Sequence, residues 1–317
     1  MAKHRSSLPQ LDDRLFLTDG GIETTLIFLD GLDLPYFAAF HLLQTPEGEA
    51  ALRKYFATYA ALASRLGTGL VLESPTWRSN PDWATKLGYS PEALAEANRK
   101  AIGLMEEVRA EVEGPDTPVV ISGCVGPRGD GYIPTTIMSD KEAAEYHREQ
   151  VEAFAGTAAD MVSAITMNYV EEAIGVTRAA QSAGMPVAVS FVVETDGKLA
   201  TGQTLQSAVE TVEEATSGYP SYYMINCAHP SHFDHVLSGG QWTQRIRGVR
   251  ANASRKSHAE LDEATELDSG DPAEFGSDYA DLKSRLSQLN VMGGCCGTDH
   301  RHIDQIASKC LPLFATS

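Results

Sequence analysis

Three cysteines in this sequence have the residue type and the surroundings of a metal site. Cys295 and Cys296 are adjacent in the stretch MGGCCGT, and Cys227 lies far upstream in INCAHP. Thiolate sulfur is a soft ligand that selects zinc over magnesium or calcium. Catalytic zinc sites usually have three protein ligands and one open position for water or substrate, whereas structural sites close with four. The residues therefore predict a catalytic Zn²⁺ site made by Cys227, Cys295 and Cys296.

Adjacent cysteines can share one ion only if the chain leaves strand geometry, because neighbours on a regular strand point to opposite faces. Gly293, Gly294 and Gly297 flank the pair and supply that backbone freedom. A redox-active disulfide between Cys295 and Cys296 is an alternative, but it leaves Cys227 unexplained.

The other cysteines and the nearby histidines have simpler interpretations. Cys124 and Cys310 are expected to be small buried side chains. Five histidines lie close in sequence to the three cysteines, and we expect them at loop and helix-start positions rather than as ligands: His229, His232, His235, His300 and His302.

Eight short apolar runs, rich in β-branched or aromatic residues, supply the elements that must position these cysteines. They cover residues 15–19, 69–73, 119–123, 161–166, 187–193, 222–227, 246–251 and 289–293. Helical periodicity separates most of them, most clearly over residues 46–66, 91–112, 140–159 and 171–183.

This alternation predicts a parallel α/β sheet, and eight units in 317 residues favour a single (β/α)₈ TIM barrel over residues 1–317. An open doubly wound sheet is the alternative, but the first run leads into DGGIETTL rather than a dinucleotide-binding glycine motif. Barrel active sites lie at the carboxyl ends of the strands. Cys227 ends the sixth run and Cys295 and Cys296 follow the eighth, so the three sulfurs can converge. The acidic residues 258–275 are expected to form a surface loop, solvated or acting as a lid.

Composition excludes several other classes of protein. A net charge of −18 argues against a nucleic-acid partner, because such sites concentrate Lys and Arg. No run of about 18 apolar residues occurs, so we expect no membrane span. The N-terminus has no apolar stretch of signal-peptide length, and five cysteines do not form a disulfide framework in a chain of this length. We therefore expect a cytoplasmic protein, with homo-oligomerisation left open.

Six segments together resemble the zinc-dependent homocysteine S-methyltransferases, the group that contains the betaine–homocysteine and S-methylmethionine–homocysteine enzymes. They are LTDGGIETTL (17–26), SGCVGPRGDGY (122–132), DGKLATGQTL (196–205), INCAHP (225–230), VRANAS (249–254) and MGGCCGTDHRHI (292–303). The resemblance implies a (β/α)₈ barrel with Cys227, Cys295 and Cys296 as zinc ligands. It also implies that Asp19 and Gly20 begin a substrate-contacting loop, and that Asn226 and Asn252 lie near the metal.

One position departs from the family pattern. Ile165 in SAITMNYVEEA stands where the family has the glutamate that binds the amino group of homocysteine. An apolar side chain cannot pair with an ammonium, and burying an unpaired charge is costly. Either another carboxylate takes this role, with Glu23, Glu73 and Glu194 as candidates, or the acceptor thiol has no free amine.

The expected activity is transfer of a methyl group from a sulfonium or quaternary ammonium donor to a zinc-bound thiol. Homocysteine as the acceptor would give methionine. Aromatic faces attract such cations, and Trp77, Trp83, Tyr132 and Tyr169 follow strand ends. Two alternatives stay open: an onium-compound demethylase that uses a different thiol acceptor, and a zinc-binding or redox-sensing barrel without turnover.

Overall fold

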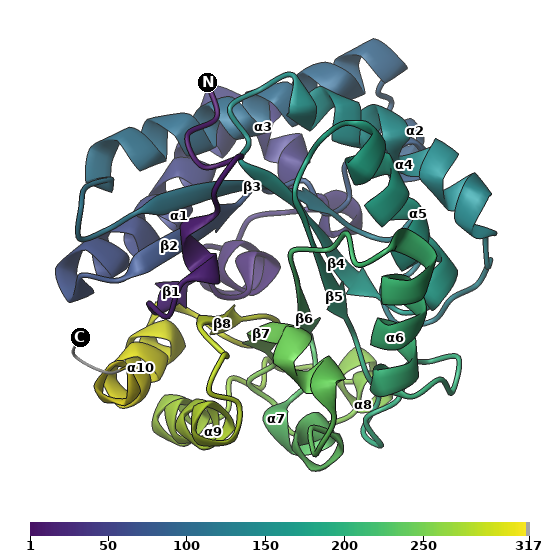
Figure 1. Ribbon diagram of the computed structural model, residues 1–317. Helices are drawn as coiled ribbons and strands as arrows, with labels where there is room; N and C mark the ends of the chain where they lie inside the picture. The colour runs from purple at the N-terminus through teal and green to yellow at the C-terminus, as the bar shows by residue number, and fades with distance from the viewer. Residues whose placement is uncertain (315–317) are drawn as a thin grey trace.

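Eight parallel strands close into a barrel in chain order in the computed structural model of the protein, with β8 pairing to β1 (Figure 1). Residues 1–314 are described. The strands are β1 (Phe16–Leu17), β2 (Gly69–Glu73), β3 (Val119–Val125), β4 (Met161–Met167), β5 (Val187–Phe191), β6 (Tyr222–Asn226), β7 (Ile246–Ala251) and β8 (Val291–Gly294). The predicted barrel is confirmed, and the doubly wound alternative is excluded. The first strand is shorter than its apolar run, with two paired residues on each side.

Helices surround the strands as an outer ring (Figure 1). They are α1 (Pro46–Leu66), α2 (Pro81–Lys86), α3 (Pro91–Val112), α4 (Asp140–Ala155), α5 (Val170–Ser182), α6 (Leu205–Thr216), α7 (Pro230–Phe233), α8 (His258–Asp262), α9 (Pro272–Arg285) and α10 (His300–Cys310). Side-chain caps fix several starts, including a capping box of Ser139 and Glu142 at the start of α4. Helix α4 ends four residues before its predicted end, because Gly156 terminates it and the chain then turns into β4.

The barrel interior changes character along the strands. Alternate residues of each strand point inward, and near the amino ends they form a buried apolar cluster that includes Phe16, Val71, Val120, Met161, Tyr222 and Val291. Two residues further towards the carboxyl ends of the strands, the buried inward positions are polar: Glu73, Ser122, Ser163, Ser190, Asn226 and Arg250. The main apolar core lies outside, between the strands and the helices. Polar chemistry is therefore concentrated at the carboxyl end of the barrel.

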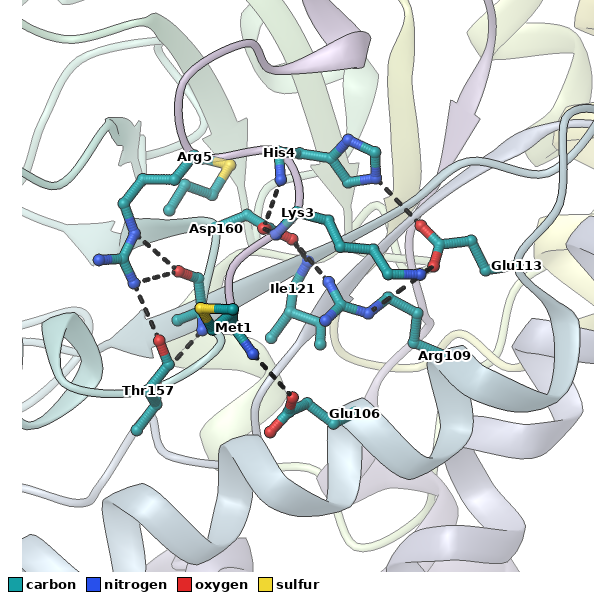
Figure 2. A network of polar contacts seen from close by, with 12 residues as sticks. Met1, Lys3, His4, Arg5, Glu106, Arg109, Glu113, Ile121, Thr157 and Asp160 are labelled. Atoms are coloured by element: carbon teal, nitrogen blue, oxygen red, sulfur yellow. Dashed lines mark hydrogen bonds and ion pairs between the residues drawn. The ribbon is translucent and has the colours of Figure 1, made fainter.

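The opposite end of the barrel is held by one buried carboxylate. Asp160, directly before β4, accepts hydrogen bonds from the backbone N–H groups of Lys3 and His4 at 2.7 Å each, and from that of Ile121 at 2.9 Å. The Nη1 of buried Arg109 donates to its second oxygen at 3.0 Å (Figure 2). Such full pairing is what allows a charge to be buried. This network anchors the N-terminal segment and lies away from the cysteines.

The acidic segment predicted as a surface loop follows β7. Most of its residues are exposed, but its ends are helical, forming α8 and the first turn of α9. On its inner side, Leu261 and Leu267 line a cavity at the barrel mouth. The segment is therefore a cover over the carboxyl end of the barrel as well as a solvated connection. None of the helices within residues 1–314 has the length and apolar character needed to cross a membrane.

Candidate metal centre

The three predicted ligand cysteines converge at the barrel mouth. Their sulfurs all lie within 4.8 Å of one another, although Cys227 follows β6 and the other two follow β8. In this structure Cys227 and Cys295 form a disulfide, and Cys296 is a free thiol. The disulfide weighed in the sequence analysis, between Cys295 and Cys296, is not the one that forms. The structure thus describes an oxidised cluster, which must be reduced before all three sulfurs can bind a metal.

Close packing explains the glycines around the adjacent cysteines. A side chain at Gly293 would collide with Thr18, and one at Gly294 would collide with Thr298. The N–H of Cys295 still donates to the carbonyl oxygen of Ala251, extending the β7–β8 ladder. After this bond the chain turns, and Gly297 adopts a φ of +80°, a conformation that favours glycine. The turn allows Cys295 and Cys296 to approach one point.

Asn226 positions Cys227. Its Nδ2 donates to the Sγ of Cys227 at 3.1 Å and to the Oγ1 of Thr166 at 2.8 Å. Its Oδ1 accepts from the N–H of Thr166 at 3.0 Å and from the Oγ of Ser190 at 2.6 Å. Cys227 and Thr166 both have left-handed φ values, +54° and +65°, which cost about 1 kcal/mol for a non-glycine residue. The amide of Asn226 stabilises both conformations.

A second amide holds the same loop from outside the cavity. Asn252 is buried, and its Nδ2 donates to the carbonyl oxygen of Cys227 at 2.9 Å. The Nε2 of His258 lies 2.6 Å from that oxygen, so this nitrogen carries a proton and donates. Asn252 does not line the cavity. It supports the backbone of Cys227 through its hydrogen bond to this carbonyl oxygen.

A cavity of about 350 Å³ opens above the barrel interior beside the cysteines. Nine of the predicted site residues line it: Asp19, Gly20, Glu23, Glu73, Ile165, Asn226, Cys227, Cys295 and Cys296. Of the four predicted aromatic residues, Trp77 and Tyr132 line the cavity, whereas Trp83 and Tyr169 do not. The hydroxyl of Tyr132 lies 3.5 Å from the Sγ of Cys296, and its ring packs on His258 with centroids 4.2 Å apart.

A buried ion pair in the barrel interior was missed by the sequence analysis. Arg250, from β7, donates through Nη2 to the Oδ1 of Asp19 at 2.5 Å and through Nε to the carbonyl oxygen of Gly294 at 3.3 Å. The hydroxyl of Tyr55 donates to the second oxygen of Asp19 at 2.9 Å. Burial raises the pKa of Asp19, although Arg250 opposes this effect. The only sequence signal was a pair of arginines, Arg247 and Arg250, inside an otherwise apolar strand.

Two carboxyl groups of the cavity titrate near neutral pH. Glu73 is buried; its Oε1 accepts from the Oγ of Ser163 at 2.9 Å, and its Oε2 has no partner within residues 1–314. Burial raises the pKa of Glu73 to about 7, even though Arg250 lies close enough to lower it. Burial likewise raises the pKa of Glu23 to about 7. Both groups can therefore be neutral or charged under physiological conditions.

Comparison with family models identifies one family. The model of the homocysteine S-methyltransferase family matches residues 16–310. The oxidized form of the homocysteine methyltransferase MmuM from Escherichia coli superposes with a TM-score of 0.74 at 19% identity, covering 97% of this chain and 100% of that chain. The metallated form of the same enzyme gives 0.72 at 18% identity, covering 96% and 99%. At this identity the superpositions demonstrate a shared fold. No curated protein sequence matches significantly.

The raised pKa of Glu73 predicts a specific pH dependence of stability. Because the folded state favours the protonated group, its contribution is fully present below pH 4.5 and is lost as the pH rises through about 7. The shift corresponds to about 3 kcal/mol at most. Between pH 5 and 8 the free energy of unfolding, measured by urea denaturation, should fall more for the wild type than for Glu73→Gln, whose side chain stays neutral.

Glu145→Gln is the matched control, because that side chain is exposed on α4. It should keep the wild-type pH dependence. Identical pH dependence in the wild type and Glu73→Gln would contradict the assignment of Glu73 as a buried titrating group.

Proposed function

Because the chain belongs to the homocysteine S-methyltransferase family and is therefore a methyltransferase, we propose that it methylates a thiol held at the three-cysteine site. The methyl donor is a sulfonium or quaternary ammonium compound, and the acceptor is homocysteine or a related thiol. The observation that carries the proposal is the convergence of three sulfurs from two strand ends beside one cavity.

The donor set fits zinc. Three cysteine sulfurs lie within one coordination sphere of each other, and nitrogen or oxygen ligands are not needed to complete a catalytic site. When reduced, Cys227, Cys295 and Cys296 would hold the ion, which would supply deprotonation of the bound acceptor thiol at neutral pH. One of the MmuM structures similar to this chain is described as metallated.

The protein's own residues bind and orient the two substrates. The faces of Trp77 and Tyr132 and the carboxylates of Glu23 and Glu73 give the cavity a surface that attracts an onium cation. The acceptor thiolate attacks the methyl carbon, the bond from that carbon to the onium sulfur or nitrogen breaks, and the electron pair stays with the now neutral leaving group. Positioning accounts for much of the rate in such a reaction.

Ile165 bears on the identity of the acceptor. Its side chain lines the cavity and is 7% exposed, so it presents an apolar wall. Glu73 lies next to this wall, because it bonds Ser163, two residues before Ile165 on the same face of β4. Glu23 is the other cavity carboxyl group with a pKa near neutrality. We assign the attraction of a positively charged substrate group to these two residues.

The third candidate carboxylate fits less well. Glu194 does not line the cavity, and its Oε1 lies 3.4 Å from the Nδ1 of His258.

The demethylase alternative is favoured by one observation, the apolar Ile165, because a thiol without an amine would meet no mismatch there. A demethylase would differ from a homocysteine methyltransferase in accepting a wider range of thiols, and its metal chemistry would be the same.

Replacing one ligand should remove metal and activity together. Cys296→Ala leaves two sulfurs, so we expect its zinc content to fall from about one per chain to a small fraction, with loss of methyl transfer to homocysteine from a panel of onium donors. Metal content is measured by atomic emission on protein purified under reducing conditions. Cys310→Ala, a buried thiol on α10, is the control and should keep both. Retention of zinc and activity in Cys296→Ala would refute the proposed site.

Restoring a carboxylate at position 165 should improve homocysteine as a substrate. Ile165→Glu places an anion at the cavity wall, and a charged hydrogen bond to the ammonium should lower KM for homocysteine by about 10-fold. Ile165→Gln is the matched control, because it has a similar shape without the charge. KM for 3-mercaptopropanoate, a thiol without an amine, should not fall. An unchanged KM for homocysteine in Ile165→Glu would show that position 165 does not face the amino group.

A further inference from the structure

Arg78 is a buried cation that has no role in the reaction described above. It lies in the loop between β2 and α2, lines the cavity, and is 6% exposed. Within residues 1–314 no carboxylate oxygen comes within 4.0 Å of its guanidinium nitrogens. The other buried arginines differ, because Arg250 pairs with Asp19 and Arg109 pairs with Asp160. A buried charge without a partner is costly, so this arrangement requires an explanation.

The guanidinium packs against two indole rings. Its central carbon lies 4.1 Å from the ring centroid of Trp77 and 4.1 Å from that of Trp83. Its Nη1 donates to the carbonyl oxygen of Gly129 at 2.7 Å. Cation–π contacts of this kind are attractive and leave the in-plane N–H donors free. The side chain is therefore oriented before any ligand arrives.

The surrounding loops are fixed by buried hydrogen bonds. The Oγ1 of Thr76 donates to the carbonyl oxygen of Cys124 at 2.7 Å, and the Nδ2 of Asn80 donates to that of Pro127 at 3.1 Å. Gly126 and Gly131 leave the space that the Trp77 ring occupies, since a side chain at either would press on it. Thr76 and Asn80 lie two residues before and two residues after Arg78, so these hydrogen bonds fix the backbone on both sides of it.

The donors of Arg78 are incompletely used. Its Nε is buried and has no hydrogen-bond acceptor among the described residues. The nearby carboxylates do not supply one: Asp130 accepts from the N–H groups of Tyr132 at 2.8 Å and Ile133 at 3.0 Å, and Glu23 forms no ion pair with Arg78. The unpaired donor thus belongs to a side chain that faces the cavity.

We propose that Arg78 binds a carboxylate group carried by a substrate of the methyl-transfer reaction. The identity of the reaction rests on the proposed function. The presence of a carboxylate on a substrate is inferred from the surroundings of Arg78 alone. The edge of a guanidinium presents two parallel N–H donors that match the two oxygens of a carboxylate. The ligand is a monoanion, because the same cavity contains Asp19, Glu23 and Glu73, and its other arginine, Arg250, is already neutralised by Asp19.

Arg78 lines the same cavity as the three cysteines. Its Nη1 donates to the carbonyl oxygen of Gly129, three residues before Tyr132, and the Tyr132 hydroxyl lies 3.5 Å from the Sγ of Cys296. A short molecule could therefore place a carboxylate at Arg78 and its reacting group beside the cysteines. This molecule is either the acceptor thiol or the onium donor, and the two share the same carboxylate chemistry at Arg78.

A matrix of donors and acceptors identifies which substrate carries the carboxylate. The donors are trimethylsulfonium and 3-(dimethylsulfonio)propanoate, and the acceptors are 2-mercaptoethanol and 3-mercaptopropanoate, so one member of each pair has no carboxylate. In Arg78→Gln, KM should rise about 10- to 100-fold for one carboxylate-bearing substrate, with kcat nearly unchanged. KM for both substrates without a carboxylate should stay the same. Arg78→Lys keeps the charge but not the planar edge and should recover only part of the loss.

Arg128→Gln is the matched control. Arg128 also packs over an aromatic ring, Tyr146, but it pairs with Asp82 and does not line the cavity. Its KM values should equal those of the wild type. Uniform effects of Arg78→Gln on all four substrates, or no effect on any, would overturn the proposal.

Binding without turnover separates this inference from the proposed function. Two of the three tryptophans flank Arg78, so intrinsic fluorescence of the reduced protein should change on titration with whichever carboxylate binds. Carboxylate binding that Arg78→Gln abolishes, without methyl transfer, would support Arg78 and refute the reaction. Transfer with wild-type affinity in folded Arg78→Gln and Arg78→Lys would refute Arg78 and leave the reaction standing. Circular dichroism melting verifies that each variant is folded.

Discussion

The ion pair between Arg250 and Asp19 spans the strand that leads to the adjacent cysteines. Arg250 belongs to β7 and Asp19 follows β1, with β8 between them, and Arg250 also binds the carbonyl oxygen of Gly294 at the end of β8. Gly293 and Gly294 have no side chains, so β8 can pack closely against Thr18 and Thr298. The position of Cys295 and Cys296 relative to Cys227 therefore depends on the closing seam of the barrel, where one buried charge pair fixes three consecutive strand ends.

The polar layer of the barrel interior gives the site its electrostatic character. Below it the inward side chains are apolar, so the charges of Asp19, Glu73 and Arg250 are poorly screened and interact strongly. Arg250 pairs directly with Asp19, not with Glu73. Burial raises the pKa of Glu73, and its Oε2 has no hydrogen-bond partner within residues 1–314. The cavity thus combines a carboxyl group that can accept a cation with a separate guanidinium, Arg78, that can accept an anion. This combination suits small molecules that carry both charges.

The sequence was sufficient to predict the elements that have a periodic pattern. All eight strands were located, and the ends of α1 and α3 were predicted correctly, because helix caps and hydrophobic periodicity are local properties. The convergence of Cys227 with Cys295 and Cys296 followed from the rule that barrel strands end at one mouth. The pairing of Cys227 with Cys295 did not follow, since it depends on where the turn after β8 directs each side chain.

Charged residues with tertiary partners were harder to predict. Arg250 pairs with Asp19, 231 residues away in the sequence, and Asp160 pairs with Arg109, 51 residues away. No local pattern identifies such pairs. Arg78 was missed because its environment comes from the neighbouring Trp77, from Trp83 in the next helix and from a glycine-rich loop after β3. The cavity-facing side of residues 258–275 was equally hidden, because an acidic composition reports exposure but not which few apolar residues turn inward.

The most direct test of the account is zinc X-ray absorption spectroscopy on the reduced, zinc-loaded protein, before and after addition of homocysteine. Three sulfur scatterers and one lighter atom should surround the ion at first, and a fourth sulfur should replace the lighter atom when the thiol binds. That change would show that the three cysteines hold a metal with an open position for the acceptor. A reduced protein that binds no zinc, or a zinc environment with fewer than three sulfurs, would contradict the central claim.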